Sequence, residues 1–151
     1  MLHDFLINAV TRLFRETKLI VDQLDDQLVT NKPIESGKPL GEIFLHIIRS
    51  AEFYLRGLVE NKWEPLSYNL ETYGTAQAMQ ALYKNVNDKM EDYIKQLAPD
   101  MMTEVITLFN RPATKAEILQ ELIEHTIHHR GQIIVYYRLL GVEPAIIPYI
   151  I

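Results

Sequence analysis

The sequence predicts an all-α fold, a single four-helix bundle with at least one long crossover connection. The chain has 151 residues, near the usual size of one domain, and its hydrophobic content of 48% is enough to fill one core. Four long segments place apolar residues at the 3.6-residue spacing of an amphipathic helix. The segments between them differ in length, and the chain shows no internal repeat. Residues 1–151 are therefore expected to form one bundle domain.

The first predicted helix spans about Leu2 to Leu28. From Leu6 onward, its apolar residues fall close to one face of a helix. The following segment, Val29 to Lys38, is a predicted loop because several of its residues favour turns or fix unusual backbone angles. These residues are Asn31, Pro33, Ser36 and Gly37.

The second predicted helix spans about Pro39 to Glu60. Proline suits the first turn of a helix, where its missing N–H would have no intrahelical partner, and apolar residues continue behind it at helical spacing. The segment Asn61 to Gly74 has no helical period but is rich in aromatic residues, which predicts a long ordered connection that packs over the bundle. Its aromatic residues are Trp63, Tyr68 and Tyr73.

A third helix is predicted from Thr75, a suitable N-terminal cap, to Pro99. The segment from Met102 to Asn110 is apolar enough to be extended, but it is short, and we treat it as a crossover segment leading to the last helix. Its apolar residues include Val105, Ile106, Leu108 and Phe109.

The fourth predicted helix has the clearest start. Thr114 and Glu117 form a capping box, in which each side chain accepts a hydrogen bond from the backbone N–H of the other residue. Gly141 is a suitable C-terminal stop, so the helix would be about 27 residues long, near 40 Å. The tail from Val142 to Ile151 is mostly apolar and contains prolines, so we expect it to dock on the body of the protein or on a partner subunit.

The composition excludes several classes of function. Charged residues make up 23% of the chain and the formal net charge is −5, so no broad basic field is available to attract a nucleic acid. The chain contains no cysteine, which rules out a disulfide framework and a thiolate nucleophile. Any bound metal must therefore be held by imidazole and oxygen ligands.

No targeting or membrane segment is evident in the sequence. Near the N-terminus, Asp4 stands where an export signal has basic residues, and Asn8 and Thr11 interrupt the apolar residues. No apolar run approaches the roughly 18 to 20 residues that a membrane span requires. We expect a cytoplasmic protein without a membrane segment.

A group of histidines on the fourth predicted helix indicates metal binding. His125 and His129 are four residues apart, so their side chains lie one above the other and can point two imidazoles at one ion. Thr126 stands where the helix of a zinc protease has its glutamate, so that motif is absent. His128 could replace either ligand, and spacing alone leaves this choice open. His46, near the apolar edge of the second helix, could supply a third ligand, although a histidine in such a place is more often an ordinary hydrogen-bonded residue.

Two motifs together resemble a known family. The string from His125 to Gln132, His-Thr-Ile-His-His-Arg-Gly-Gln, followed by the Leu-Leu-Gly that ends at Gly141, resembles the C-terminal signature of the DinB-like (DinB/YfiT) metalloproteins. The segment from Leu40 to His46 is similar to the part of that family's second helix that carries a histidine. The order and spacing of the motifs match over nearly the whole chain.

This resemblance implies a four-helix bundle that binds one divalent transition metal (zinc, nickel or iron) through His46, His125 and His129. It thereby favours these three residues over His128. The family often has an Asp-Tyr pair in its C-terminal tail, whereas this chain has Pro148 and Tyr149 there. A role carried by that acidic residue is therefore not expected here.

Three neutral imidazoles leave the charge of a divalent ion uncompensated and one coordination position open, which suits the activation of water or of a thiol. By the resemblance, we expect a transferase that activates a small-molecule thiol for attack on an electrophile in stress response or detoxification, and a homodimer. The alternatives are a metal-binding protein without turnover and a metal-dependent hydrolase, for which no carboxylate is evidently placed as a base. A di-iron site is not expected because no Glu-x-x-His pair is present.

Four further residues near the predicted ligands have more than one interpretation. Glu42 and Glu121 each precede a predicted ligand by four residues, and they either orient the imidazoles or are ordinary solvated charges. Arg130 either serves the site or pairs with an acidic neighbour, and Gln132 either serves the site or forms a packing contact. We assign no catalytic role to any of these residues.

Overall fold

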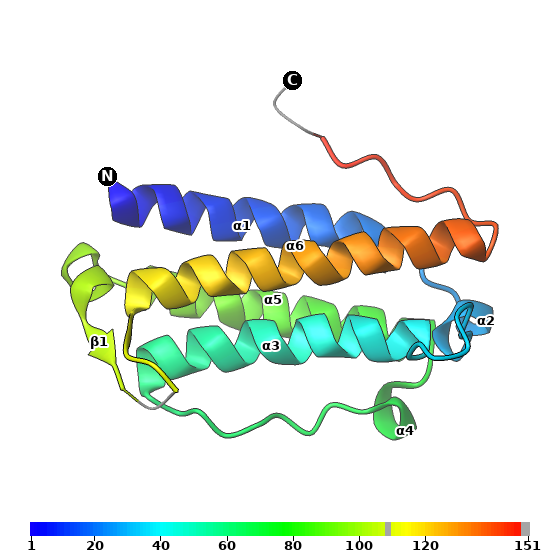
Figure 1. Ribbon diagram of the computed structural model, residues 1–151, viewed down its shortest axis with the longest axis horizontal. Helices are drawn as coiled ribbons and strands as arrows, with labels where there is room; N and C mark the ends of the chain where they lie inside the picture. Colours follow the sequence, from blue (N-terminus) through cyan, green and yellow to red (C-terminus); the bar gives the residue numbers. More distant parts are fainter. Residues whose placement is uncertain (108–109, 149–151) are drawn as a thin grey trace.

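Four long helices lie side by side in the computed structural model, which describes residues 1–107 and 110–148 (Figure 1). They are α1 (Leu2–Val21), α3 (Leu40–Glu60), α5 (Ala76–Gln96) and α6 (Lys115–Leu139). Shorter elements occupy the connections: α2 (Asp26–Val29), α4 (Leu70–Tyr73), η1 (Pro99–Thr103), β1 (Val105–Ile106) and β2 (Ala113–Thr114).

The four long helices form a bundle in which consecutive helices are not always neighbours. Both α1 and α3 pack against α5 and α6, so α1 and α3 lie across the diagonal from each other. Helices α1 and α6 run in one direction along the bundle, and α3 and α5 run in the opposite direction (Figure 1). Because α3 and α5 are parallel, the segment that joins them crosses the whole length of the bundle. The predicted four-helix bundle with a long crossover is confirmed.

One hydrophobic core takes side chains from all four long helices. Two of its buried tyrosines bond to backbone carbonyl groups of α1: the hydroxyl of Tyr83 donates to the carbonyl oxygen of Phe14 at 2.7 Å, and that of Tyr137 donates to the carbonyl oxygen of Ile20 at 2.6 Å. Each bond ties α1 to a neighbouring helix without leaving a polar atom unpaired. No helix within the two described ranges is both long enough and apolar enough to cross a membrane.

The first helix is shorter than predicted. It ends at Val21 rather than at Leu28, and the separate helix α2 follows it. The side chain of Asp25 accepts hydrogen bonds from the backbone N–H groups of Gln27 and Leu28, which starts a new helix and interrupts the old one. Leu24 and Leu28 are nevertheless buried in the core, which explains why the apolar spacing continues past the end of α1.

The connection between α3 and α5 is ordered and packs over the bundle, as predicted. The ring of Trp63 lies against Gly57 so closely that a Cβ atom at this glycine would be 2.4 Å from it. The hydroxyl of Tyr68 donates to the buried carboxylate of Glu52 at 2.7 Å. The short helix α4, capped by Asn69, was not predicted, because a single turn is too short to show a period.

The connection between α5 and α6 contains a small antiparallel sheet. Strands β1 and β2 pair with Val105 opposite Thr114. The predicted third helix was too long, because α5 ends before Pro99, which begins the 3-10 turn η1. Leu108 and Phe109, part of the predicted crossover segment, lie outside the described residues.

Helix α6 has the predicted start and end. Thr114 and Glu117 form the capping box. At the other end, Gly141 has a φ of +77°, and the N–H of Val142 donates to the carbonyl oxygen of Tyr137 at 2.8 Å. This arrangement, in which glycine takes the left-handed conformation, satisfies carbonyl groups that the helix leaves unpaired.

The C-terminal tail docks on the body of the same chain as far as Ile147. The side chain of Gln23 donates to the carbonyl oxygen of Glu143 at 2.9 Å and accepts from the N–H of Ala145 at 2.6 Å. Ile147 is buried. Residues 149–151, including Tyr149, lie outside the described residues. Since the tail finds its contacts within the chain, it lends no support to the homodimer, which stays a proposal.

Candidate metal centre

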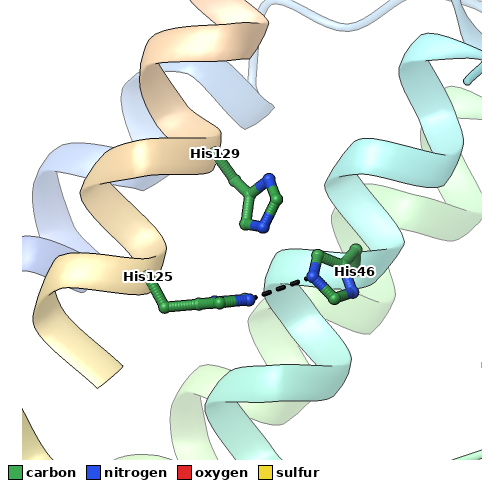
Figure 2. A group of neighbouring side chains, drawn as sticks. All are labelled: His46, His125 and His129. Atoms are coloured by element: carbon green, nitrogen blue, oxygen red, sulfur yellow. Dashed lines mark hydrogen bonds between the residues drawn. The ribbon is translucent and has the colours of Figure 1, made fainter. Parts of the chain in front are cut away.

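His46 of α3 converges with His125 and His129 of α6, and Figure 2 shows the three imidazole rings directed toward one another. The Nε2 atoms of His46 and His125 are 3.0 Å apart. The ring of His129 lies 4.5 Å, between centroids, from each of the other two rings. One ring nitrogen from each residue lies within 4.8 Å of those of the other two. We call these residues the three-histidine cluster.

The packing of α3 against α6 produces this convergence. His46 follows Leu45 and precedes Ile47, both fully buried, so its ring leaves the helix at the edge of the apolar face. That edge faces the side of α6 where His125 and His129 stand one turn apart. The helical spacing that predicted two imidazoles on one side is therefore observed, and His46 supplies the third.

All three imidazoles are held in the neutral form. Burial is the first cause in each case: it lowers the pKa of His125 to about 4, helped by the neighbouring His129 and His46, and it also lowers the pKa values of His46 and His129 below their usual range. The positive charge of Lys38 lowers the pKa values of His46 and His129 further. At neutral pH each ring therefore keeps a nitrogen lone pair.

The hydrogen bonds of Gln132 determine the tautomer of His129. The Nδ1–H of His129 donates to the amide oxygen of Gln132 at 2.7 Å, and the amide nitrogen of Gln132 donates to Nε2 of His128 at 3.2 Å. Because Nδ1 of His129 carries the proton, its Nε2 is left with the lone pair. His128 bonds to the same amide and is not part of the three-histidine cluster, so of the residues between which spacing left a choice, His125 and His129 are the two that lie beside His46.

The donor atoms fit a divalent transition metal. Neutral imidazoles are suitable ligands for zinc, nickel and iron. Only one of the facing Nε2 atoms of His46 and His125 can carry the proton that they share, so the other presents its lone pair to the cluster. Nδ1 of His125 is buried and has no hydrogen-bond partner within the described part of the chain. A cation among the three rings could accept the lone pairs of both facing nitrogens, with the ring proton of His125 then on Nδ1.

The two glutamates near the predicted ligands make their contacts elsewhere. The carboxylate of Glu42 accepts a hydrogen bond from Arg49, which also donates to the carbonyl oxygen of Tyr68. Glu121 lines a separate cavity with Tyr54. Neither carboxylate bonds to an imidazole within the described ranges, so the idea that they orient the rings gains no support.

Arg130 pairs with an acidic residue, which was one of its two interpretations. Its guanidinium group donates to Glu16 of α1 at 3.1 Å, and both side chains are buried. The pair joins α6 to α1 on the side of α6 that faces the core. Arg130 therefore serves the packing of the bundle rather than the three-histidine cluster.

Two clefts open on the cluster from different sides. The larger, of about 650 Å³, reaches His46 and His129 between the loop before α3 and the second half of α6. The smaller, of about 320 Å³, reaches His46 and His125 and is lined mainly by residues of α3 and the crossover connection. The lining of the smaller cleft includes Phe53, Tyr54, Pro65 and Leu66. The cluster is therefore open to small molecules from two directions.

The loop residues that line the larger cleft were missed by sequence reasoning. Lys38 and Gly37 belong to the predicted loop, which showed turn signals but no sign of a role in the site. A Cβ atom at Gly37 would lie 2.2 Å from the hydroxyl oxygen of Tyr136, so only glycine allows the loop to approach α6 this closely. Such an approach between distant segments leaves no pattern in the sequence.

Comparison with known proteins identifies similar sequences and folds. The sequence model of the DinB family matches residues 8–150. The uncharacterized protein YjoA of Bacillus subtilis is 27% identical over 128 residues, which cover 83% of this chain and 82% of that protein. The crystal structure of YjoA, described as a DinB-like protein, has a TM-score of 0.78 at 22% identity and covers 95% of each chain.

Two further crystal structures share the fold. A DinB-like protein from Bacillus cereus has a TM-score of 0.79 at 22% identity, covering 97% of this chain and 95% of that chain. YfiT from Bacillus subtilis, described as a probable metal-dependent hydrolase with an unusual four-helix bundle topology, has a TM-score of 0.66 at 15% identity, covering 93% of this chain and 89% of that chain. At these identities the likeness shows the fold alone.

Proposed function

This chain belongs to the DinB family, and on that premise we propose that it is a metal-dependent thiol S-transferase in which His46, His125 and His129 hold one divalent ion. The observation that carries the proposal is the convergence of three neutral imidazoles from two helices beside two open clefts. An ion held by only three protein ligands has a coordination position left for a substrate.

The protein side chains have distinct tasks in this proposal. The imidazoles hold the ion without adding negative charge, and Gln132 keeps the lone pair of His129 directed at it. A bound divalent ion would supply Lewis acidity, which favours the thiolate form of a thiol. In the transfer, a sulfur electron pair forms the new bond to the electrophile, the leaving group departs with its own pair, and the thiol proton passes to solvent. The two clefts give the thiol and the electrophile separate approaches to the cluster.

Hydrolysis is the second candidate function, because the structurally similar YfiT is described as a probable metal-dependent hydrolase. Hydrolysis needs a base that accepts a proton from the attacking water. Within the described part of the chain, no carboxylate lines the larger cleft, and Glu42 is paired with Arg49. A free thiol, with a pKa of about 8.5, loses its proton far more readily than water, with a pKa of about 15.7, so thiol transfer depends less on such a base, and we prefer it for this reason. A metal-binding protein without turnover is the third candidate.

The cellular setting is part of the proposal. Low-molecular-weight thiols are kept reduced in the cytosol, so a cytoplasmic enzyme would find its thiol substrate there. Conjugation of a thiol to an electrophile is the chemistry of detoxification, and this fits a role in stress response.

The proposed ligands can be tested by single substitution. We expect His46→Ala, His125→Ala and His129→Ala each to abolish stoichiometric binding of zinc or cobalt(II), measured by elemental analysis after dialysis. The matched control is His128→Ala, which removes an imidazole one residue from His129 but leaves the cluster intact. Full metal content in any of the three cluster variants would contradict the proposed ligand set.

The proposed reaction is tested separately on the metal-loaded protein. We expect conjugation of small thiols to monochlorobimane, lost on metal removal and absent in His125→Ala. Release of 4-nitrophenol from 4-nitrophenyl acetate, tested without thiol, measures hydrolysis. Metal-dependent ester cleavage without conjugation would favour the second candidate, and full metal occupancy with neither activity would favour the third.

A further inference from the structure

The larger cleft is lined by a lysine and by no acidic residue in its described part, although the chain as a whole is acidic. The formal net charge is −5, yet within the described ranges no aspartate or glutamate lines this cleft. Its ionisable lining residues are Lys38 and the histidines His46, His128 and His129. A divalent ion in the cluster would raise the positive potential further.

Lys38 has no acidic partner in this cleft. Its side chain is exposed, and within the part of the chain that the structure describes it makes no ion pair or hydrogen bond. Its charge nevertheless acts on His46 and His129, which places it within electrostatic range of the cluster. A metal ion in the cluster and the ammonium group of Lys38 would repel each other. An anionic group between them would relieve this repulsion.

We propose that Lys38 binds the carboxylate of a carboxylated thiol whose sulfur lies at the three-histidine cluster. This inference rests on the proposed thiol transfer and names the substrate class. A carboxylate fits better than a phosphate, because no arginine and no helix N-terminus lines the cleft in its described part, whereas phosphate sites usually combine several such donors.

The remainder of the cleft suits the carbon skeleton of such a molecule. Its volume of about 650 Å³ is within the range of small-molecule sites. Ile34, Ile43 and Val135 add apolar surface to its lining. A Cβ atom at Gly131 would meet no other atom within 4 Å, so this glycine leaves open space on the wall formed by α6. The cleft therefore offers a cationic group, an apolar surface and the metal ligands to one molecule.

The experiment uses cobalt(II)-loaded protein and three thiols of the same chain length: 3-mercaptopropionate, 3-mercaptopropan-1-ol and 3-aminopropane-1-thiol. Binding is followed by the sulfur-to-cobalt charge-transfer absorption, a readout independent of turnover. We expect the carboxylated thiol to bind about three- to tenfold more tightly than the alcohol, as for an ion pair that is partly exposed. The amine should bind most weakly, and added salt should reduce the differences.

Lys38→Gln should remove the preference for the carboxylated thiol while leaving the affinity for the neutral thiol unchanged. Lys32→Gln is the matched control, because Lys32 lies in the same loop but does not line the cleft. Lys38→Arg should restore the preference. These variants also distinguish the inference from chelation of cobalt by the carboxylate itself, because a chelate would keep its preference in Lys38→Gln.

The outcomes separate this inference from the proposed function. If 3-mercaptopropan-1-ol gives no charge-transfer band at any concentration, thiol ligation fails and the proposed function fails with it. If the neutral thiol binds but the carboxylated thiol shows no preference, or keeps its preference in Lys38→Gln, the inference about Lys38 is wrong and the proposed function stands.

Discussion

A single amide, that of Gln132, decides which nitrogen of His129 can face a metal ion. We expect Gln132→Ala to lower the affinity for zinc by about 10- to 100-fold, the usual effect of removing a partner that orients a ligand. Gln132→Glu, which keeps an oxygen acceptor for Nδ1–H of His129, should retain the affinity. Competition with a chromophoric chelator measures both effects.

The control for this prediction lies on the same helix. Gln120 donates to Glu124 at 2.9 Å on the exposed surface of α6, away from the cluster. Gln120→Ala should leave zinc affinity unchanged. Equal affinities in Gln120→Ala and Gln132→Ala would show that the hydrogen bond to His129 does not orient the ligand.

The buried imidazole of His125 makes the stability of the metal-free protein depend on pH. Burial lowers its pKa from the usual 6.5 to about 4, so between these values the unfolded chain binds a proton that the folded protein does not. Stability is therefore fully present above about pH 6.5 and falls progressively as the pH drops toward 4. Urea unfolding of metal-free protein at a series of pH values measures this loss, which should be smaller in His125→Gln. Parallel profiles for the two proteins would contradict this origin.

The sequence predicted which histidines lie together better than it predicted the residues around them. His125 and His129 were found because helical spacing alone places them on one side of α6, and the family resemblance supplied His46. The tautomer of His129 depends on the rotamer of Gln132, and the place of Lys38 depends on how a loop folds back onto α6. Neither rotamers nor loop paths follow from periodicity, so these residues could be recognised only in the structure.

At the scale of one element, Gly131 weakens α6. Glycine in a helix interior costs about 0.5–1 kcal/mol relative to alanine, and a Cβ atom at this position would meet no atom within 4 Å. We expect Gly131→Ala to raise the free energy of unfolding by about this amount, measured by urea denaturation. Gly57→Ala is the contrasting variant: its Cβ would lie 2.4 Å from the ring of Trp63, so it should destabilise the protein. If Gly131→Ala instead lowered the free energy of unfolding, the open space beside Gly131 would have to be filled by other atoms in solution.

Element boundaries were predictable where a local hydrogen bond agreed with the apolar period. The capping box of Thr114 and Glu117 and the left-handed Gly141 mark the ends of α6 in the sequence and in the structure. At the end of α1 the two signals disagree, because the carboxylate of Asp25 starts a new helix while Leu28 continues the apolar spacing. The period alone therefore gave a first helix that was too long.

At the scale of the whole molecule, the buried pair of Arg130 and Glu16 joins the parallel helices α1 and α6. Arg130→Met leaves the buried carboxylate of Glu16 with only the half-exposed Arg12, 3.6 Å away, so it should lower the free energy of unfolding by about 3 kcal/mol, the low end for a broken buried pair. The double variant with Arg130→Met and Glu16→Leu should recover most of the loss, because it leaves neither charge buried. Guanidinium unfolding of the three proteins tests this. A double variant no more stable than Arg130→Met would show that packing, rather than charge, sets the cost.

The arrangement of the helices was predictable only in part. Four amphipathic patterns and unequal connections predicted a bundle with a crossover. The segment between α3 and α5 is long enough either to turn back or to run along the bundle. Its length therefore does not predict which of these paths it takes. The choice is made by contacts with α3, where Trp63 packs on Gly57 and Tyr68 bonds to Glu52. These contacts join residues that no sequence period relates.

The division of the cluster between α3 and α6 has a consequence during synthesis on the ribosome. Chains emerge from the N-terminal end, and His46 precedes His125 by 79 residues. Until α6 has been translated, a nascent chain has only one imidazole of the three, and a single imidazole binds transition metals weakly. Metal capture is thereby postponed until the polypeptide can close its bundle, and truncated products would leave the cell's pool of free ions undisturbed.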